Sequence, residues 1–230
     1  IHGSIAMNCF NPKTSDVDLL VVTKGPIDID TKRALAEACL NLSNQPYPIE
    51  ISILNARELM NWRHPFPFEF HYSEYWRVKM EQAKKKDLFL TFSEKEVDYD
   101  LAAHITILNH RGICLIGKPI DKVFPIIPHE HYLDSILRDL EDCYVNIIEK
   151  PVYSILNMLR VYYYVTENVV LSKYEAGKKG IDQFDSQFRD TIQKALHLYS
   201  QSPKSGVSIE LNELMEFRNC LKEKIENKKN

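Results

Sequence analysis

Hydrophobic residues recur with two different periods in the first part of the chain. Residues 17–22 and 49–54 are rich in Val, Ile and Leu, as strands are, and in the second run apolar and polar residues alternate. Between them, Asp30-Thr31 marks the start of a helix whose apolar residues fall on one face. We therefore predict a strand–helix–strand unit in which the two strands lie next to each other.

After the proline-rich stretch 124–128, the pattern is that of helices only. Apolar residues return at helical spacing in five segments: residues 129–148, 152–165, a segment that begins at Leu171, 184–199 and 209–225. The second of these is apolar on nearly all sides, which predicts a central position. The predicted fold class is α+β, with a small α/β domain containing a mixed sheet over residues 1–127, followed by an all-α helical bundle over residues 128–230.

Composition excludes several classes of protein. The 230 residues are 44% hydrophobic and 27% charged with a net charge of −3, which gives no general electrostatic attraction to nucleic acid or to an anionic membrane. Five scattered cysteines without a C-x-x-C pair fit a reducing cytoplasm better than a disulfide framework. No apolar stretch approaches transmembrane length. We expect a cytoplasmic protein without nucleic-acid or membrane partners. Because it opens at Ile1 without Met, in what reads as the end of a strand, we expect its N-terminus to be incomplete.

A pair of carboxylates enters the first predicted strand. Asp16 and Asp18 are two residues apart, so their side chains lie on the same face of a strand. Two carboxylates a few Å apart repel each other by about 1–4 kcal/mol, and a bound cation relieves that repulsion. Mg²⁺ suits carboxylate oxygens and completes its shell with water and substrate phosphates. Upstream, Gly3-Ser4 offers a hydroxyl and free N–H groups for phosphate. Together these residues predict metal-assisted phosphoryl or nucleotidyl transfer.

The second predicted strand carries an acid of its own. Glu50 lies on the polar face of residues 49–54, and an isolated Glu there would face solvent on an edge strand. Beside the strand that carries Asp16 and Asp18, however, it becomes a candidate third acid of the site. Asp100 and His104, four residues apart in a predicted helix, are interpreted as a pair on the helix surface.

An aromatic-rich stretch, residues 68–77, has two possible roles. Its rings can pack in the core under a loop, or they can form one wall of a ligand pocket. In the second case Tyr75 or Trp76 would stack on a ring of the ligand.

Taken together, these residues resemble a known family. Gly3-Ser4, Asp16-x-Asp18 and Glu50 resemble the signature of the polymerase-β-like nucleotidyltransferase superfamily. A more specific resemblance is to the aminoglycoside adenylyltransferases of the 3″/9 type, which act on streptomycin and spectinomycin. It rests on a series of matches in order along the chain: Pro12-x-x-Ser15-Asp16-x-Asp18-Leu19-Leu20-Val21, Glu50-Ile51-Ser52, Trp62-Arg63-x-Pro65, Tyr72-Ser73-Glu74-Tyr75, Asp100-Leu101-Ala102, Gly117-Lys118-Pro119, Leu159-Arg160 and Ser172-Lys173.

The resemblance implies transfer of AMP from Mg·ATP to a hydroxyl group of an aminoglycoside or aminocyclitol. Residues 1–127 would form the nucleotidyltransferase domain, and residues 128–230 a helical domain that closes over substrate and nucleotide. Asp16 and Asp18 would hold Mg²⁺, and Glu50 would be the general base and a further metal ligand. The residues expected to bind ATP are Gly3, Ser4, Ser15 and Lys173.

The sequence departs from the family pattern at the acceptor. Tyr75, or Trp76 if the loop shifts by one residue, falls at the family's drug-contacting aromatic position. Where the family carries an acid before its central helix, Lys150 takes that place and Glu149 precedes it. Either Glu149 contacts the acceptor, or the acceptor differs. The alternatives are the same chemistry on another small molecule or on a protein, and an inert nucleotide-binding regulatory domain.

Overall fold

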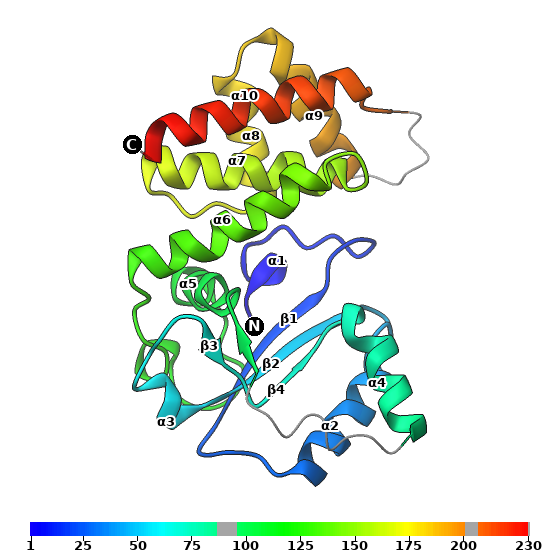
Figure 1. Cartoon of the computed structure of the whole chain (residues 1–230), viewed down its shortest axis with the longest axis vertical. Helices are drawn as coiled ribbons and strands as arrows, with labels where there is room; N and C mark the ends of the chain where they lie inside the picture. Colours follow the sequence, from blue (N-terminus) through cyan, green and yellow to red (C-terminus); the bar gives the residue numbers. More distant parts are fainter. Residues whose placement is uncertain (87–95, 201–206, 230) are drawn as a thin grey trace. The chain divides into compact units, whose positions relative to one another are not determined.

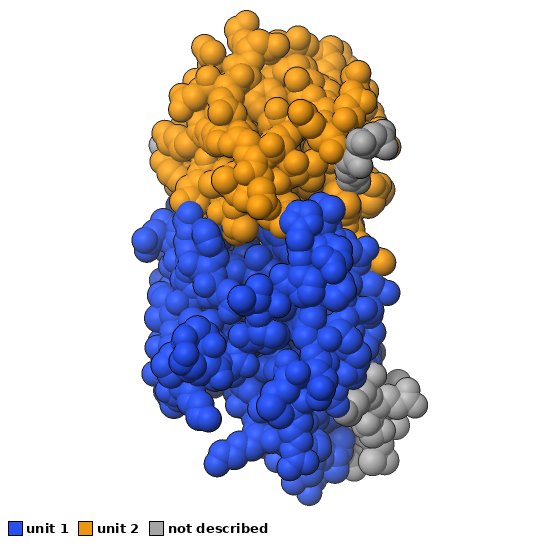
Figure 2. All heavy atoms as spheres, turned by 90° about the vertical axis from the view of Figure 1, so that its left-hand side faces the viewer, with its two compact units in different colours: residues 1–135 blue, residues 136–230 orange. Residues whose placement is uncertain are grey.

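The computed structural model describes residues 1–86, 96–200 and 207–229 of the chain. It divides into two compact units, Ile1–Ser135 and Ile136–Asn230, which have separate colours in Figure 2. Strands and helices mix in the first unit, whereas the described residues of the second form helices and connecting segments (Figure 1). This arrangement confirms the predicted α+β class.

A three-stranded mixed sheet forms the centre of the first unit. Strands β1 (Val17–Thr23) and β2 (Ile49–Asn55) are parallel, and β4 (Phe70–Tyr72) pairs with β2 in the antiparallel direction. Helix α2 (Ile29–Leu42) connects β1 to β2. The strand–helix–strand unit expected from the sequence is therefore present, and its two strands are neighbours.

Alternation along β2 decides which side chain faces which layer. Ile51 and Ile53 pack with Ala36 of α2 and Tyr72 of β4 on one side of the sheet. Leu54, with the opposite orientation, packs against α5 (Leu101–Arg111) on the other side. The sheet thus lies between a layer made by α2 and α4 (Glu74–Lys86) and a layer that contains α5.

The helix after β1 begins at a side-chain cap. The Asp28 carboxylate accepts a hydrogen bond from the Thr31 N–H group at 2.7 Å, so the helix begins at Ile29, slightly before the predicted start at Asp30. The remaining elements of the first unit are short connectors and two longer helices: α1 (Gly3–Ala6), α3 (Ala56–Leu59), β3 (Phe66–Pro67), α4 (Glu74–Lys86), β5 (Val97–Asp98), α5 (Leu101–Arg111) and the 3₁₀ helix η2 (Ile120–Lys122). Strands β3 and β5 form a separate antiparallel pair.

The secondary-structure elements described in the second unit are helices, and α7 is their centre. These are α6 (His129–Val145), which contains the boundary between the units, α7 (Pro151–Glu167), α8 (Lys173–Gln183), α9 (Ser186–Ser200) and α10 (Leu211–Lys229). Helix α7 contacts α8, α9 and α10, which confirms the central position predicted from its apolar pattern. None of the described helices is long and apolar enough to cross a membrane.

Candidate active site

Asp18 and Glu50 meet across the two parallel strands. The register places Asp18 directly opposite Glu50. Burial, and after it the negative charge of Glu50, raises the pKa of Asp18 to about 7, with Asp16 adding a smaller effect in the same direction. Two carboxylates therefore lie close together at this end of the strands, an arrangement that a bound cation would stabilise.

Gly3 lies directly against the Asp18 carboxylate. Its φ of +59° is a conformation that glycine adopts easily, and a Cβ atom added there would lie 1.8 Å from Asp18 Oδ2. The Ser4 N–H group donates a hydrogen bond to the Asp18 carboxylate, while the His2 N–H group donates to the Asp18 carbonyl at 3.1 Å. The Ser4 hydroxyl is buried without a hydrogen-bond partner in the described part of the chain. The Gly-Ser segment is thus held beside the acids, with one hydroxyl left to bind something else.

Ser15 and Asp16 immediately precede β1. The Ser15 hydroxyl accepts a hydrogen bond from the Asn11 N–H group at 3.0 Å and so helps to fold the loop before the strand. Within residues 1–86, 96–200 and 207–229, no three His, Cys, Asp or Glu side chains are grouped as a metal site. The structure therefore pairs Asp18 with Glu50, and Asp16 contributes through its charge. Such a pair still fits Mg²⁺, which commonly takes one or two carboxylates and completes its shell with substrate phosphates and water.

His104 is a site residue that the sequence interpretation missed. Its Nε2 atom lies 3.9 Å from Glu50 Oε1, so the interpretation of Asp100 and His104 as a mere surface pair is wrong. Burial lowers the pKa of His104, but Glu50 and the neighbouring acids, Asp98, Asp100 and Asp18, outweigh it and hold that pKa above its ordinary value. One signal was available: His104 lies in the same inward stripe of α5 as its buried apolar residues.

Two more histidines extend this polar face of the sheet. The His2 ring lies 4.8 Å from the His104 ring, centroid to centroid. On β4, His71 Nδ1 lies 2.9 Å from the Ser52 hydroxyl, and Ser52 follows Glu50 by two residues on the same face of β2. Of these imidazoles, that of His104 lies nearest to Glu50, with the His2 ring against it and His71 hydrogen-bonded to Ser52 on the neighbouring strand.

The two candidate aromatic residues, Tyr75 and Trp76, have different surroundings. The Tyr75 side chain is 89% exposed at the start of α4. Trp76 is partly buried against the core that α2 forms with the sheet, and the Lys79 ammonium lies 4.0 Å from its ring centroid. Of the two, Tyr75 presents its ring to solvent, whereas Trp76 belongs to the packed layer.

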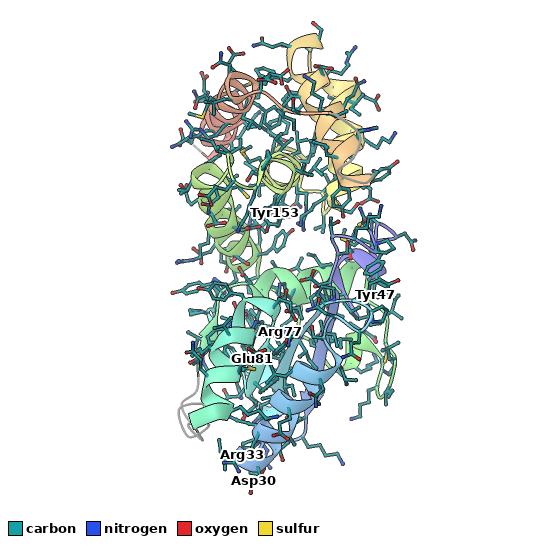
Figure 3. The ribbon with its side chains drawn as sticks, turned by 90° about the vertical axis from the view of Figure 1, so that its right-hand side faces the viewer. Asp30, Arg33, Tyr47, Arg77, Glu81 and Tyr153 are labelled. Atoms are coloured by element: carbon teal, nitrogen blue, oxygen red, sulfur yellow. The ribbon has the colours of Figure 1, made fainter. Side chains whose placement is uncertain are left out.

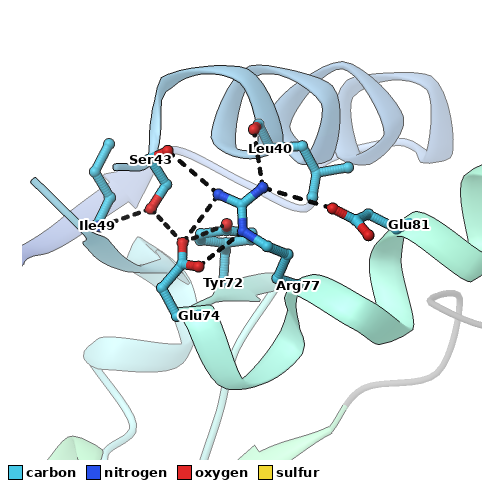
Figure 4. A network of polar contacts seen from close by, with 7 residues as sticks. All are labelled: Leu40, Ser43, Ile49, Tyr72, Glu74, Arg77 and Glu81. Carbon is cyan, nitrogen blue, oxygen red and sulfur yellow. Dashed lines mark hydrogen bonds and ion pairs between the residues drawn. The ribbon is translucent and has the colours of Figure 1, made fainter. Parts of the chain in front are cut away.

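A charged network fixes the start of α4 and therefore the position of Tyr75 (Figure 4). The Glu74 carboxylate accepts hydrogen bonds from Arg77 Nε at 2.7 Å, from the Ser43 hydroxyl at 2.6 Å and from the Tyr72 hydroxyl at 2.9 Å. The hydrogen bond from Arg77 is the main reason that the pKa of Glu74 falls to about 2. Arg77 also donates to the Leu40 carbonyl of α2 at 3.1 Å.

The two remaining candidates, Lys173 and Glu149, belong to the second unit. Lys173 is the first residue of α8, directly after a capping box formed by Ser172 and Glu175. Its ammonium group lies 4.0 Å from the ring centroid of Tyr153. Glu149 is exposed, two residues before α7 begins.

Comparisons with known proteins agree with this fold and its sequence signature. The family model "Aminoglycoside adenylyltransferase, C-terminal domain" matches residues 122–224. An aminoglycoside (3″)(9) adenylyltransferase of Escherichia coli is 22% identical over 238 residues, which cover 98% of this chain and 86% of that protein. A spectinomycin 9-adenylyltransferase of Staphylococcus aureus is 26% identical over 191 residues, covering 79% of this chain and 67% of the relative.

A solved structure shares the fold. The crystal structure of a spectinomycin adenyltransferase from Enterococcus faecalis, with ATP and spectinomycin, superposes with a TM-score of 0.77 at 23% identity, over 98% of this chain and 89% of that one. These findings confirm the resemblance inferred from the sequence. Over almost its whole length, the chain is similar to aminoglycoside (3″)(9) and spectinomycin 9-adenylyltransferases.

Proposed function

We propose that the protein transfers AMP from Mg·ATP to a hydroxyl group of an aminoglycoside or aminocyclitol such as spectinomycin or streptomycin. The observation that carries this proposal is the placement of Asp18 opposite Glu50, beside the Gly3-Ser4 segment. The relatives support it, because they are named as aminoglycoside and spectinomycin adenylyltransferases and one of them was solved with ATP and spectinomycin.

Each residue has a separate part in the proposed reaction. Glu50 accepts the proton of the acceptor hydroxyl, whose oxygen then forms a bond to the α-phosphorus of ATP. The bond between that phosphorus and the bridging oxygen breaks, and pyrophosphate leaves with the electron pair. When bound at Asp18, with Asp16 and Glu50 nearby, Mg²⁺ supplies positive charge to the phosphate oxygens.

The cofactor-binding residues hold the rest of the nucleotide. We propose that the unpartnered Ser4 hydroxyl donates to a phosphate oxygen, with Gly3 allowing close approach and Ser15 shaping the loop beside it. Lys173 neutralises charge that develops on the departing pyrophosphate. Tyr75, exposed at the start of α4, and Glu149 contact the acceptor.

Pyrophosphate release tests this function. We expect the purified protein with Mg·ATP to release pyrophosphate in the presence of spectinomycin or streptomycin, and mass spectrometry to find the drug with AMP attached. Glu50→Gln should reduce the rate by about 10²–10⁴-fold, the usual contribution of a general base. Glu130→Gln, an exposed carboxamide substitution in α6, is the matched control and should leave the rate unchanged. Absence of drug adenylylation at saturating concentrations would reject the drug assignment.

One observation favours a different acceptor. By the resemblance, Lys150 falls where the family pattern has an acid, and its exposed ammonium would repel a cationic aminocyclitol. If this side chain faces the acceptor, the same AMP transfer would act on a neutral or anionic hydroxyl compound. Incubation of the protein and labelled ATP with a fractionated metabolite mixture separates the two cases, because only the second gives labelled products without an aminoglycoside.

A further inference from the structure

The second unit contains a polar network centred on Asp139 of α6. The Tyr153 hydroxyl donates to its two carboxylate oxygens at 2.9 and 3.1 Å, and Asn157 Nδ2 donates to the same carboxylate. Both donors lie on α7 and are four residues apart, so they reach Asp139 from successive turns of one helix face (Tyr153 is labelled in Figure 3). Asn157 is only 2% exposed. A buried amide with a charged partner is held in one orientation.

One arm of the network runs through the backbone that leads to Lys173. The oxygen of the Asn157 amide accepts a hydrogen bond from Arg160 Nη1 at 2.9 Å. Arg160 Nε in turn donates to the Leu171 carbonyl at 3.0 Å, two residues before Lys173. The capping box formed by Ser172 then fixes the first turn of α8. The chain is therefore held on both sides of Lys173.

The other arm reaches the side chain of Lys173 itself. The Tyr153 ring whose hydroxyl is bound to Asp139 is the ring under the Lys173 ammonium, at 4.0 Å from its centroid. Burial, and after it the charge of Asp139, raises the pKa of Tyr153 above its ordinary value, so the phenol stays a hydrogen-bond donor. A free lysine side chain carries about 2 kcal/mol of rotamer entropy, and a fixed aromatic surface restricts those rotamers before a ligand arrives.

We propose that Asp139 is a positioning residue for Lys173. Through Tyr153 it orders the side chain, and through Asn157 and Arg160 it orders the backbone, so that the ammonium is pre-organised before nucleotide binds. The consequence for ATP rests on the function proposed above, in which Lys173 contacts the phosphates. The ordering of Lys173 itself does not depend on that function.

Nucleotide binding without acceptor tests the consequence. For Asp139→Asn, calorimetric titration with Mg²⁺ and a non-hydrolysable ATP analogue should show affinity lower by about tenfold, equivalent to about 1.4 kcal/mol. The KM for the acceptor should stay constant. Tyr153→Phe keeps the ring but removes the hydroxyl that binds Asp139, so it should lose less affinity for the analogue. It replaces Asp139→Asn in this test if that variant does not fold. Asp142→Asn is the matched control, because Asp142 lies on the same helix and its carboxylate accepts an exposed hydrogen bond from Asn146 at 2.7 Å.

A double-mutant cycle shows whether the effect passes through Lys173. In a Lys173→Ala background, Asp139→Asn should no longer weaken analogue binding, because there is no ammonium left to position. A full tenfold loss in that background would overturn the proposal, since Asp139 would then act on the nucleotide by another route.

Chemical labelling tests the ordering without any nucleotide. Released from its aromatic contact, Lys173 should react several-fold faster with an amine-selective reagent in Asp139→Asn and Tyr153→Phe than in the wild type. Lys179, on the same helix beside Tyr163, is the internal control in the same digest. An unchanged labelling rate at Lys173 would overturn the inference. Suppose that Lys173 is labelled faster in Asp139→Asn and Tyr153→Phe, but that the Lys173→Ala variant binds the analogue normally. This combination would reject the phosphate role of Lys173 and leave the positioning role of Asp139 intact.

Discussion

Replacing Asp18 by Asn should make the metal-free protein more stable at neutral pH. The substitution removes one of the two facing carboxylates but keeps an oxygen that can accept the hydrogen bond from the Ser4 N–H group. In the wild type at neutral pH, folding places the charged Asp18 carboxylate in a partly buried position opposite Glu50. An amide of nearly the same shape has no such cost.

The magnitude follows from the shift of the Asp18 pKa from 3.8 to about 7. Between these values the folded protein binds more protons than the unfolded chain, so its free energy of unfolding falls as the pH rises. Three pKa units correspond to about 4 kcal/mol at most, at about 1.36 kcal/mol per unit. Above pH 7 the full penalty applies, and below pH 4 it vanishes. The gain from Asp18→Asn should therefore be largest at pH 8 and near zero at pH 4.

Urea unfolding in the presence of a chelator measures this difference. Both tryptophans of the chain, Trp62 and Trp76, lie in the first unit, so their fluorescence reports on the unit that contains Asp18. Asp121→Asn, at an exposed position of the same unit, is the control and should follow the wild type at every pH. Added Mg²⁺ should stabilise the wild type at pH 8 more than Asp18→Asn. An Asp18→Asn protein less stable than the wild type at pH 8, or with the same pH dependence, would refute the reasoning.

Three further predictions concern the surroundings of the site. Gly3→Ala should reduce turnover by more than tenfold, because the added Cβ would lie 1.8 Å from a carboxylate oxygen; an unchanged kcat would contradict the close approach. Tyr75→Ala should raise the KM for the acceptor with no change in thermal stability. Trp76→Ala should instead lower the free energy of unfolding by about 2–4 kcal/mol. Steady-state kinetics and thermal denaturation of both variants distinguish the two effects. Glu74→Gln should lower the free energy of unfolding by about 1–3 kcal/mol, because it weakens the hydrogen bonds with Arg77. Since the pKa of Glu74 is lowered on folding, the stabilisation that Glu74 gives the wild type should be lost as the pH falls from about 4 to about 2. Urea unfolding at pH 6 and pH 2.5 checks the last of these, and equal losses at both pH values would count against it.

The pairing of the acids could be predicted from the sequence because it depends on local periodicity. Alternation along residues 49–54 places Glu50 on the polar face, and a strand–helix–strand order makes the two strands neighbours. Asp18 and Glu50 are each the second residue of their strands, and the register places them opposite each other. The hydrophobic pattern of α7 likewise predicted its central place among the helices.

Other contacts follow only from the way distant elements pack. His104 reaches Glu50 because α5 lies on that face of the sheet, and a surface-pair interpretation of the same helix was equally consistent with local spacing. The sequence left both Tyr75 and Trp76 as candidates, and the packing of α4 exposes Tyr75 and partly buries Trp76.

The same distinction applies to the proposed phosphate-binding residues. The sequence by itself determined which residues carry acids, hydroxyls and cations, and on which face of a strand or helix each one lies, because the backbone period sets the direction of every side chain. It did not determine their partners. The network that joins Asp139 to Lys173 links helices α6, α7 and α8, and it forms only when those helices pack against one another.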